Sequence, residues 1–155
     1  GMPYDCDKIM AIADKYGISV IEDVAEGCGS RWKGQVLGTF GKFGVLSFNG
    51  NKMITTSGGG ALICRDAESK NNIMWYATQA RDAYPYYQHT AIGYNYRMSN
   101  ICAGIGRGQM TVLNDHVEHH KHVQALYKEK RGTGNAATRA FYDYQIMTID
   151  KLFKD

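Results

Sequence analysis

The sequence predicts an α/β fold, and its first half carries the features that indicate this class. A stretch with helical spacing leads directly into a short β-branched run at residues 18–21, and further short apolar runs follow at residues 45–48 and 61–64. A helix followed at once by a strand is half of a parallel α/β layer. Ligands of such layers gather beyond the carboxyl ends of the strands, so polar residues at those ends are candidate site residues.

Local signals define the first helix and the first strand. Asp5 is a good N-cap, the apolar residues after it repeat at helical spacing, and Gly17 can adopt the left-handed cap conformation. The strand expected at residues 18–21 ends in two acids, and the second of them is Asp23. We therefore expect Asp23 to stand at a strand end.

The middle of the chain is organised by turn residues. Residues 28–41 are rich in glycine, and Lys33-Gly34 is typical of a hairpin turn. The strands expected at residues 45–48 and 61–64 are separated by a loop that contains Lys52 and three successive glycines at 58–60. This order predicts that Lys52 lies where a strand gives way to a loop.

The second half is predicted to be mainly helical. We expect a helix over residues 67–79, an irregular segment over 80–98, a helix beginning near Asn100 with Ser99 as its cap, and a helix over 115–131 capped by Asn114. Residues 1–131 are expected to form one portion of a domain, whereas 132–155 form a linker and tail that remain unassigned.

The helix that begins near Asn100 contains unusual glycines. Each interior glycine costs such a helix up to about 1 kcal/mol relative to alanine. Glycines inside a helix usually indicate close packing against another backbone, and the three positions concerned are Gly104, Gly106 and Gly108.

Composition limits the class of protein. The chain has 155 residues, 44% of them hydrophobic and 21% charged, with a net charge of +3. This charge is too small to indicate nucleic-acid binding, and no apolar run approaches the roughly 20 residues that span a bilayer. No signal peptide opens the sequence, and the four cysteines are widely spaced, which favours buried, reduced thiols over disulfides. These features together predict a cytoplasmic protein without a membrane segment.

Lys52 is the most informative single residue. An amine on a tight turn, beside hydroxyls and backbone amides, suits a group that forms a Schiff base with a phosphorylated aldehyde. Asp23, at a strand end, suits an anion facing a pyridinium nitrogen, and Ser47, with nearby amides, suits phosphate binding. For each residue a plain alternative stays open: a surface lysine, an acid at a helix cap or on the surface, and a serine on an exposed strand face.

Other motifs carry weaker signals. The glycines at 58–60 match neither the P-loop nor the dinucleotide-binding pattern, which disfavours a P-loop kinase and a Rossmann dehydrogenase. His116 and His120 lie four residues apart on one helical face, but no obvious third ligand accompanies them, so a solvated face is favoured over a metal site. The tyrosines around Pro85 indicate either a loop that covers a site or an aromatic surface.

Four stretches together resemble the DegT/StrS family of sugar-nucleotide aminotransferases, which use pyridoxal 5′-phosphate (PLP). Their order and spacing agree with the family from residue 1 to about residue 131, and they are residues 3–10, 21–26, 47–60 and 93–100. The resemblance implies part of the large PLP-binding domain of a fold type I aminotransferase. That domain is a three-layer α/β/α structure with a mostly parallel sheet, here followed by helices.

The resemblance also implies roles for single residues. Lys52 matches the lysine that binds PLP covalently and then moves a proton between donor and acceptor carbons. Asp23 matches the acid at the pyridine nitrogen, Glu26 a position near the ring, and Ser47 a phosphate-binding hydroxyl. Asn95 matches an asparagine that reaches the cofactor phosphate of the neighbouring subunit, which implies a homodimer. No metal is implied.

The implied reaction is amino transfer from an amino acid, usually glutamate, to a keto group of a nucleotide-linked sugar. Such reactions serve amino-sugar and polysaccharide biosynthesis. Family members are several hundred residues long, so we interpret the chain as the C-terminal part of a large PLP domain from a truncated gene. Two alternatives stay open: a non-catalytic remnant with weak or no PLP binding, and an unrelated nucleotide-binding or interaction module.

Overall fold

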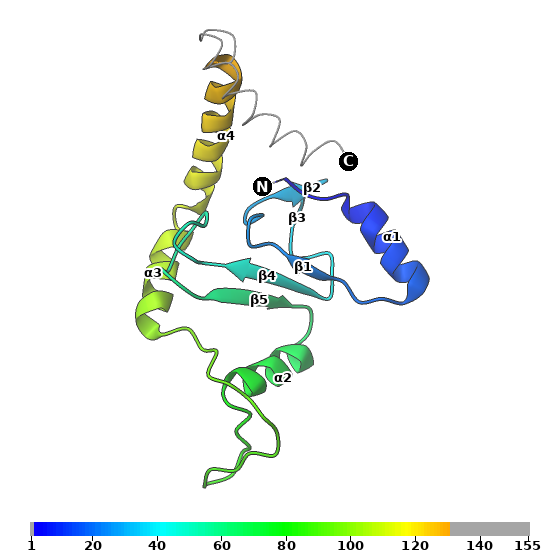
Figure 1. The fold of residues 1–155 in the computed structure, drawn as a ribbon, viewed down its shortest axis with the longest axis vertical. Helices are drawn as coiled ribbons and strands as arrows, with labels where there is room; N and C mark the ends of the chain where they lie inside the picture. The colour runs from blue at the N-terminus through cyan, green and yellow to red at the C-terminus, as the bar shows by residue number, and fades with distance from the viewer. Residues whose placement is uncertain (1, 131–155) are drawn as a thin grey trace. The chain divides into compact units, whose positions relative to one another are not determined.

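The computed structural model describes residues 2–130 in two compact units, residues 3–110 and the residues from Thr111 on, and each unit is described by itself. The first unit contains α1 (Cys6–Tyr16), β1 (Ile21–Asp23), β2 (Arg31–Trp32), β3 (Gln35–Val36), β4 (Phe43–Ser47), β5 (Gly60–Cys64), α2 (Ala67–Ala77) and α3 (Asn100–Met110), as Figure 1 shows. The second unit contains α4 (Leu113–Lys130).

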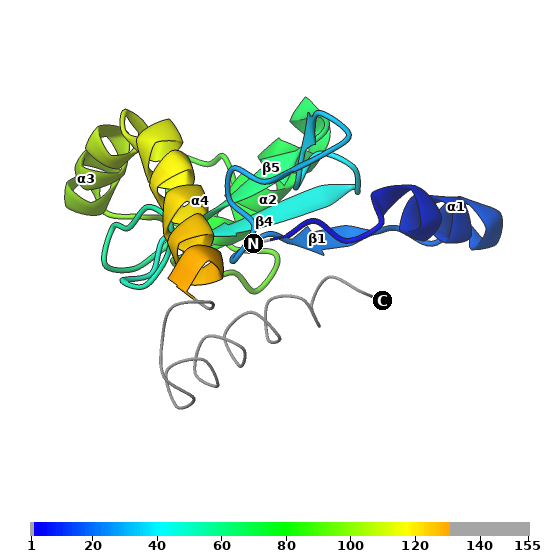
Figure 2. The same cartoon turned by 90° about the horizontal axis from the view of Figure 1, so that it is seen from above.

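A three-stranded sheet lies at the centre of the first unit. Its strand order is β1-β4-β5, with β1 parallel to β4 and β5 antiparallel to β4. Figures 1 and 2 place α1 and α3 toward opposite ends of this sheet. The predicted α/β class is confirmed. Over the described residues the sheet is mixed rather than mostly parallel, because the chain turns back in the loop after β4 and β5 then pairs antiparallel with β4.

The first helix forms as predicted, whereas the first strand begins later than predicted. The Asp5 carboxylate accepts a hydrogen bond from the Lys8 backbone N–H at 3.1 Å, and Gly17 has a φ of 63°. The Ile18 N–H then closes the helix by donating to the Ala13 carbonyl at 2.9 Å. Because Ile18 takes part in this cap, the expected strand at residues 18–21 was misplaced, and β1 occupies Ile21–Asp23.

The turn at Lys33-Gly34 is confirmed. Both residues have positive φ, 46° for Lys33 and 89° for Gly34, and they join β2 to β3. The other strands differ from prediction only at their ends: β4 covers residues 43–47 instead of 45–48, and β5 begins one residue earlier, at Gly60. Pairing with β1 extends β4 backward, because Ile21 lies opposite Phe43.

The buried core lies beneath the carboxyl end of β1. Its fully buried members are Cys6, Val24 and Leu37, and partly buried aromatic side chains pack against them. All four cysteines are free, as predicted, but Cys6 alone is buried. The outer side of α1 carries exposed apolar residues, including Ile12 and Tyr16. The small core makes the polar anchors of the strands important for stability.

The helices of the second half are largely as predicted. α2 ends at Ala77, two residues early, and residues 80–98 contain no helix and only isolated bridges. The Ser99 hydroxyl accepts from the Cys102 N–H at 3.2 Å, which confirms Ser99 as the cap of α3. The predicted cap Asn114 is wrong: α4 begins at Leu113, so Asn114 lies within its first turn. Residues 132–155, the expected tail, lie outside the described residues.

The glycines of α3 have different surroundings. A Cβ atom on Gly106 would lie 3.0 Å from the Thr56 Cγ2 atom, so this glycine allows a close approach, but to a side chain and not to the backbone that we expected. At Gly104 and Gly108 no atom of the described residues lies within 4 Å of the added Cβ. For these two the expectation of close packing fails within the part of the chain that the structure describes.

Gly104→Ala and Gly108→Ala are therefore expected to stabilise the chain, each by about 0.5–1 kcal/mol, because alanine restricts the unfolded backbone and meets no neighbour. Gly106→Ala is the matched comparison, and its gain should be cancelled by crowding against Thr56. Denaturant unfolding measures all three. A loss of stability in Gly104→Ala would contradict the open surroundings of that residue.

Candidate functional site

The candidate site lies where the two parallel strands end. Asp23 is the last residue of β1, and Ser47 is the last residue of β4. The register places Asp23 opposite Val45, and the Val24 N–H continues the pairing by donating to the Val45 carbonyl at 2.9 Å. The two polar residues therefore end neighbouring strands at one edge of the sheet, where α/β folds bind ligands.

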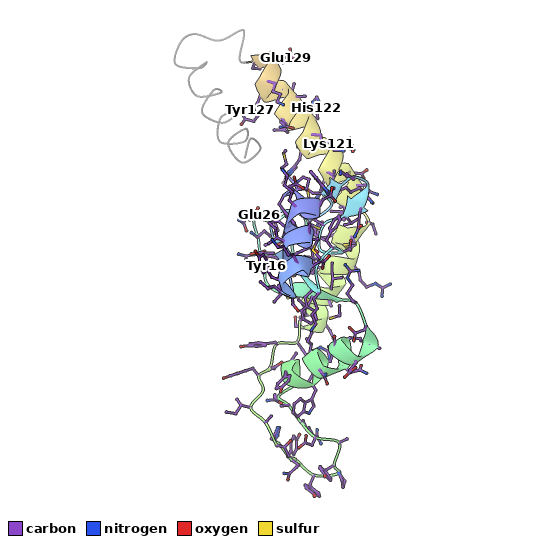
Figure 3. The ribbon with its side chains drawn as sticks, turned by 90° about the vertical axis from the view of Figure 1, so that its right-hand side faces the viewer. Tyr16, Glu26, Lys121, His122, Tyr127 and Glu129 are labelled. Atoms are coloured by element: carbon purple, nitrogen blue, oxygen red, sulfur yellow. The ribbon has the colours of Figure 1, made fainter. Side chains whose placement is uncertain are left out.

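Lys52 lies in the loop that follows β4, and its amine is shielded from solvent. Its side chain is 14% exposed, and its Nζ forms an ion pair with Oε1 of Glu26, whose own side chain is 76% exposed. Figure 3 labels Glu26. The Lys52 N–H donates to the Asn49 carbonyl at 3.1 Å, which tightens the start of the loop. Lys52 is therefore held within the fold and is not a freely solvated surface lysine.

Asp23 and Ser47 keep polar atoms at the surface of this edge. The Asp23 Oδ1 atom accepts from the Ala25 N–H at 3.0 Å, and the residue as a whole is exposed. Ser47 Oγ accepts from the Asn49 N–H at 3.5 Å. A carboxylate and a hydroxyl beside backbone amides thus flank the loop that carries the amine.

The fifth predicted residue, Asn95, belongs to a different part of the unit. It forms an isolated bridge with Thr78, and its Oδ1 accepts from the Arg97 N–H at 3.4 Å. The structure therefore brings Glu26 and Lys52 into contact and places Asp23 and Ser47 at the same edge, whereas the contacts of Asn95 lie beyond α2. The role expected for Asn95 requires a neighbouring subunit.

Glu22 is a buried acid that the sequence reasoning passed over. One of its carboxylate oxygens accepts from the N–H groups of Phe40 and Gly41, each at 2.7 Å, and the other accepts from the Gly38 N–H at 2.8 Å. Burial by itself would raise the pKa of Glu22, but the Gly41 and Gly38 amides, with the others around it, hold that pKa below its usual range. The carboxylate thereby fixes the glycine-rich segment against β1, next to Asp23.

A signal for Glu22 was present in the sequence. An ionised carboxylate can only accept hydrogen bonds, so an acid between Ile21 and Asp23 needs donors if it is buried, and the glycine-rich segment after it offers backbone amides. Gln109 was also passed over. Its Oε1 accepts from the Thr55 N–H at 3.2 Å across 54 residues of sequence, and no local pattern predicts such a pair.

The structure shows what surrounds the histidines of α4 within its described part. No group of three or more His, Cys, Asp or Glu side chains that could hold a metal ion occurs within residues 2–130. Figure 3 shows Lys121 and His122 among the labelled side chains along α4.

No helix within residues 2–130 is both long and apolar enough to cross a membrane.

The polar groups at the strand ends can be compared with those of a phosphorylated aldehyde that carries a basic ring nitrogen. A shielded amine, a carboxylate at a strand end and a hydroxyl beside backbone amides complement an aldehyde, a protonated ring nitrogen and a phosphate, respectively. These are the polar groups of PLP. The residues present therefore fit this cofactor.

A comparison with protein families identifies the family of the chain. A model of the DegT/DnrJ/EryC1/StrS aminotransferase family matches residues 1–140. Among curated relatives, the chain is 47% identical over 132 residues to EpsN of Bacillus subtilis, a candidate PLP-dependent aminotransferase, covering 85% of this chain and 34% of EpsN. It is 39% identical over 129 residues to GDP-perosamine synthase of Escherichia coli O157:H7, covering 83% of this chain and 35% of that enzyme.

A comparison with solved structures agrees with this match. The aminotransferase TlmJ of Streptoalloteichus hindustanus superimposes with a TM-score of 0.80 at 27% identity, over 87% of this chain and 37% of TlmJ. The chain thus spans about a third of the length of the relatives it matches. The matched part includes all the candidate site residues, because it reaches from residue 1 to residue 140.

Proposed function

The chain belongs to the DegT/DnrJ/EryC1/StrS aminotransferase family, and from this premise we propose that it serves PLP-dependent amino transfer to a nucleotide-linked sugar. The amino group comes from an amino acid, with glutamate as the proposed donor, and the acceptor is a keto carbon of the sugar. The names of two relatives support this proposal: EpsN for the cofactor and GDP-perosamine synthase for the class of substrate. The product belongs to amino-sugar biosynthesis.

The shielded amine of Lys52, paired with Glu26 at the carboxyl edge of parallel strands, is the observation that carries the proposal. The Lys52 Nζ would hold the cofactor covalently. Released as a neutral amine, the same Nζ would take a proton from one carbon and return it to another. The Glu26 carboxylate would hold the protonated amine at the strand ends between these two transfers.

The other residues bind and orient the cofactor. Asp23 would supply a carboxylate for the pyridine nitrogen and so favour the protonated ring, while Ser47 and the amides after it would hold the phosphate. When bound, PLP supplies an electron-withdrawing ring that stabilises negative charge on the reacting carbon. Asn95 is proposed to reach the phosphate held by a second copy of the chain, so the working unit is a homodimer.

Covalent trapping tests the proposal directly. The chain is incubated with PLP, reduced with borohydride, and digested for mass spectrometry. We expect one dominant adduct on Lys52, because its amine is shielded and held beside the proposed phosphate site. Lys8 and Lys33, whose side chains are 81% and 71% exposed, are the internal comparison. Adducts spread over these exposed lysines, or no adduct at all, would favour the non-catalytic alternative.

Amino transfer itself is tested in a chimera. Residues 1–131 of this chain replace the matching segment of GDP-perosamine synthase of E. coli O157:H7, which supplies the remaining two thirds of the enzyme. Product formation from the keto sugar nucleotide is followed by chromatography. Retained transfer supports the proposed function. A chimera that binds PLP but transfers no amine would count against it.

Asp23→Asn is expected to weaken PLP binding roughly 10- to 100-fold, because a hydrogen bond to a charged group contributes about 1.5–3 kcal/mol. The amide keeps the Oδ1 atom that accepts from the Ala25 N–H, so the local turn is preserved. Asp14→Asn on α1 is the matched control. Titration with PLP followed by absorbance gives the affinities. Equal affinity of Asp23→Asn and the unaltered chain would contradict the role of Asp23.

A further inference from the structure

The loop that carries Lys52, here called the lysine loop, comprises residues 49–59 between β4 and β5. Phe48 ties both of its ends together: the Phe48 N–H donates to the Gly59 carbonyl at 3.0 Å, and the Thr56 N–H donates to the Phe48 carbonyl at 2.9 Å. These bonds close the loop, and the Lys52–Glu26 ion pair holds its middle. The part of the loop around Thr55 and Thr56, just beyond Lys52, receives further contacts from elsewhere in the fold.

Helix α3 supplies such contacts. The Gln109 side chain accepts from the Thr55 N–H, three residues beyond Lys52, in a partly buried hydrogen bond of 3.2 Å. Gly106, one turn earlier on the same helix face, allows α3 to approach Thr56, which is 2% exposed. The bond and the close approach act on adjacent residues of the loop, so α3 holds it at one defined place.

The segment that leads into α3 adds a third contact. The Met98 Cε atom lies 2.9 Å from the position that a Cβ atom of Gly59 would take, and Gly59 has a φ of 97°, so this approach requires glycine. An apolar cavity of about 320 Å³ remains between the lysine loop, β5 and α3. Thr55, Gly106 and Gln109 all line this space, so the contacts between α3 and the loop lie at its wall.

We propose that α3 positions the lysine loop and that Gln109 is a positioning residue for Lys52, acting through the Thr55 N–H. This inference rests on the proposed function, in which the Lys52 amine attaches the cofactor. Gln109 acts on the loop through the Thr55 N–H, whereas the Lys52 amine itself pairs with Glu26. Its effect is to keep the loop closed, which keeps the amine shielded and facing Glu26.

The first measurement is made on the chain without PLP. Gln109→Met keeps the length of the side chain but removes the acceptor, whereas Gln109→Glu keeps an acceptor oxygen. We expect the Thr55 amide to exchange its hydrogen about 5- to 10-fold faster in Gln109→Met, as for the loss of one net hydrogen bond, and at the original rate in Gln109→Glu. Gln124→Met on α4 is the matched helical control and should change nothing.

The second measurement reports on the amine itself. Brief acylation with acetic anhydride, read by mass spectrometry for each lysine, should label Lys52 severalfold faster in Gln109→Met, with Lys33 unchanged. Gly106→Ala, which crowds Thr56, should act in the same direction, whereas Gly104→Ala should not. Equal global unfolding midpoints separate this local effect from a loss of fold.

The outcomes are distinct. Unchanged Thr55 exchange in Gln109→Met overturns the inference, and so does faster exchange with unchanged labelling of Lys52. A further outcome is that Thr55 exchange and Lys52 labelling both become faster in Gln109→Met while the unaltered chain gives no specific PLP adduct. In that case α3 does hold the loop, and it is the proposed function that fails. If both change and the adduct at Lys52 forms more slowly in Gln109→Met than in Gln109→Glu, the complete inference is supported.

Discussion

Lys52→Ala is expected to abolish covalent attachment of PLP and to lower amino transfer in the chimera by at least about 10²–10⁴-fold. The loss combines two roles, because the same Nζ attaches the cofactor and moves the proton, and general acid–base catalysis alone contributes a factor of this size. Borohydride trapping and steady-state kinetics measure the two effects separately. Lys42→Ala, at an exposed lysine directly before β4, is the control.

The fold should survive the Lys52→Ala change. The Glu26 partner is 76% exposed, and a pair with one solvated member contributes about 1 kcal/mol or less. A small primary amine added to the variant should restore part of the proton transfer, because it can occupy the space of the lost side chain. An adduct that persists at another lysine, with amino transfer intact, would show that Lys52 is not the attaching residue.

Glu22→Ala is expected to destabilise the chain by about 3–5 kcal/mol. The change leaves the N–H groups of Gly38, Phe40 and Gly41 without their acceptor, and each unsatisfied buried donor costs about 1–3 kcal/mol. Glu22→Gln should be intermediate, because it keeps one acceptor oxygen but turns the NH2 group of its amide toward a backbone N–H donor. Urea unfolding measures these losses, with Glu118→Ala, at an exposed acid of α4, as control. A loss below about 1 kcal/mol would contradict the anchoring role.

The same carboxylate should make stability depend on pH. Backbone amides hold the folded-state pKa of Glu22 below its ordinary value of 4.5, so the unfolded chain binds the proton more readily. The stabilisation from Glu22 is therefore complete above about pH 4.5 and is lost as the pH falls through the lowered folded-state pKa. The midpoint of urea unfolding, determined at several pH values between 3 and 7, measures this loss of stability. The dependence of the midpoint on pH should be weaker in Glu22→Gln.

Much of the fold follows from neighbouring residues. The caps at Asp5, Gly17 and Ser99 and the turn at Lys33-Gly34 were predicted, because each is completed by hydrogen bonds that span only a few residues. The errors lie at element ends. The start of β1 depends on where the cap of α1 stops, and the extents of β4 and β5 depend on which strand they pair with.

For the candidate site, too, the sequence indicated what depends on neighbouring residues and missed what depends on distant ones. The sequence indicated Asp23 as a residue at a strand end and Lys52 as an amine in a loop, since apolar runs and turn residues mark such positions. It placed Ser47 within the strand expected at residues 45–48, whereas the structure ends β4 at Ser47. It could not indicate that Glu26 pairs with Lys52. That pair joins residues 26 positions apart, and only the parallel pairing of β1 with β4 brings their loops together.

By itself, then, the sequence determined the family, the order of the elements and the chemical types that gather at the strand ends. These depend on local propensity and on motif residues that lie close together in the chain. Only the tertiary structure decided that the Lys52 amine is shielded, that Glu22 binds three loop amides, and that Gln109 holds Thr55 across 54 residues. Such contacts form between distant segments, and their partners are selected by packing rather than by any pattern along the chain.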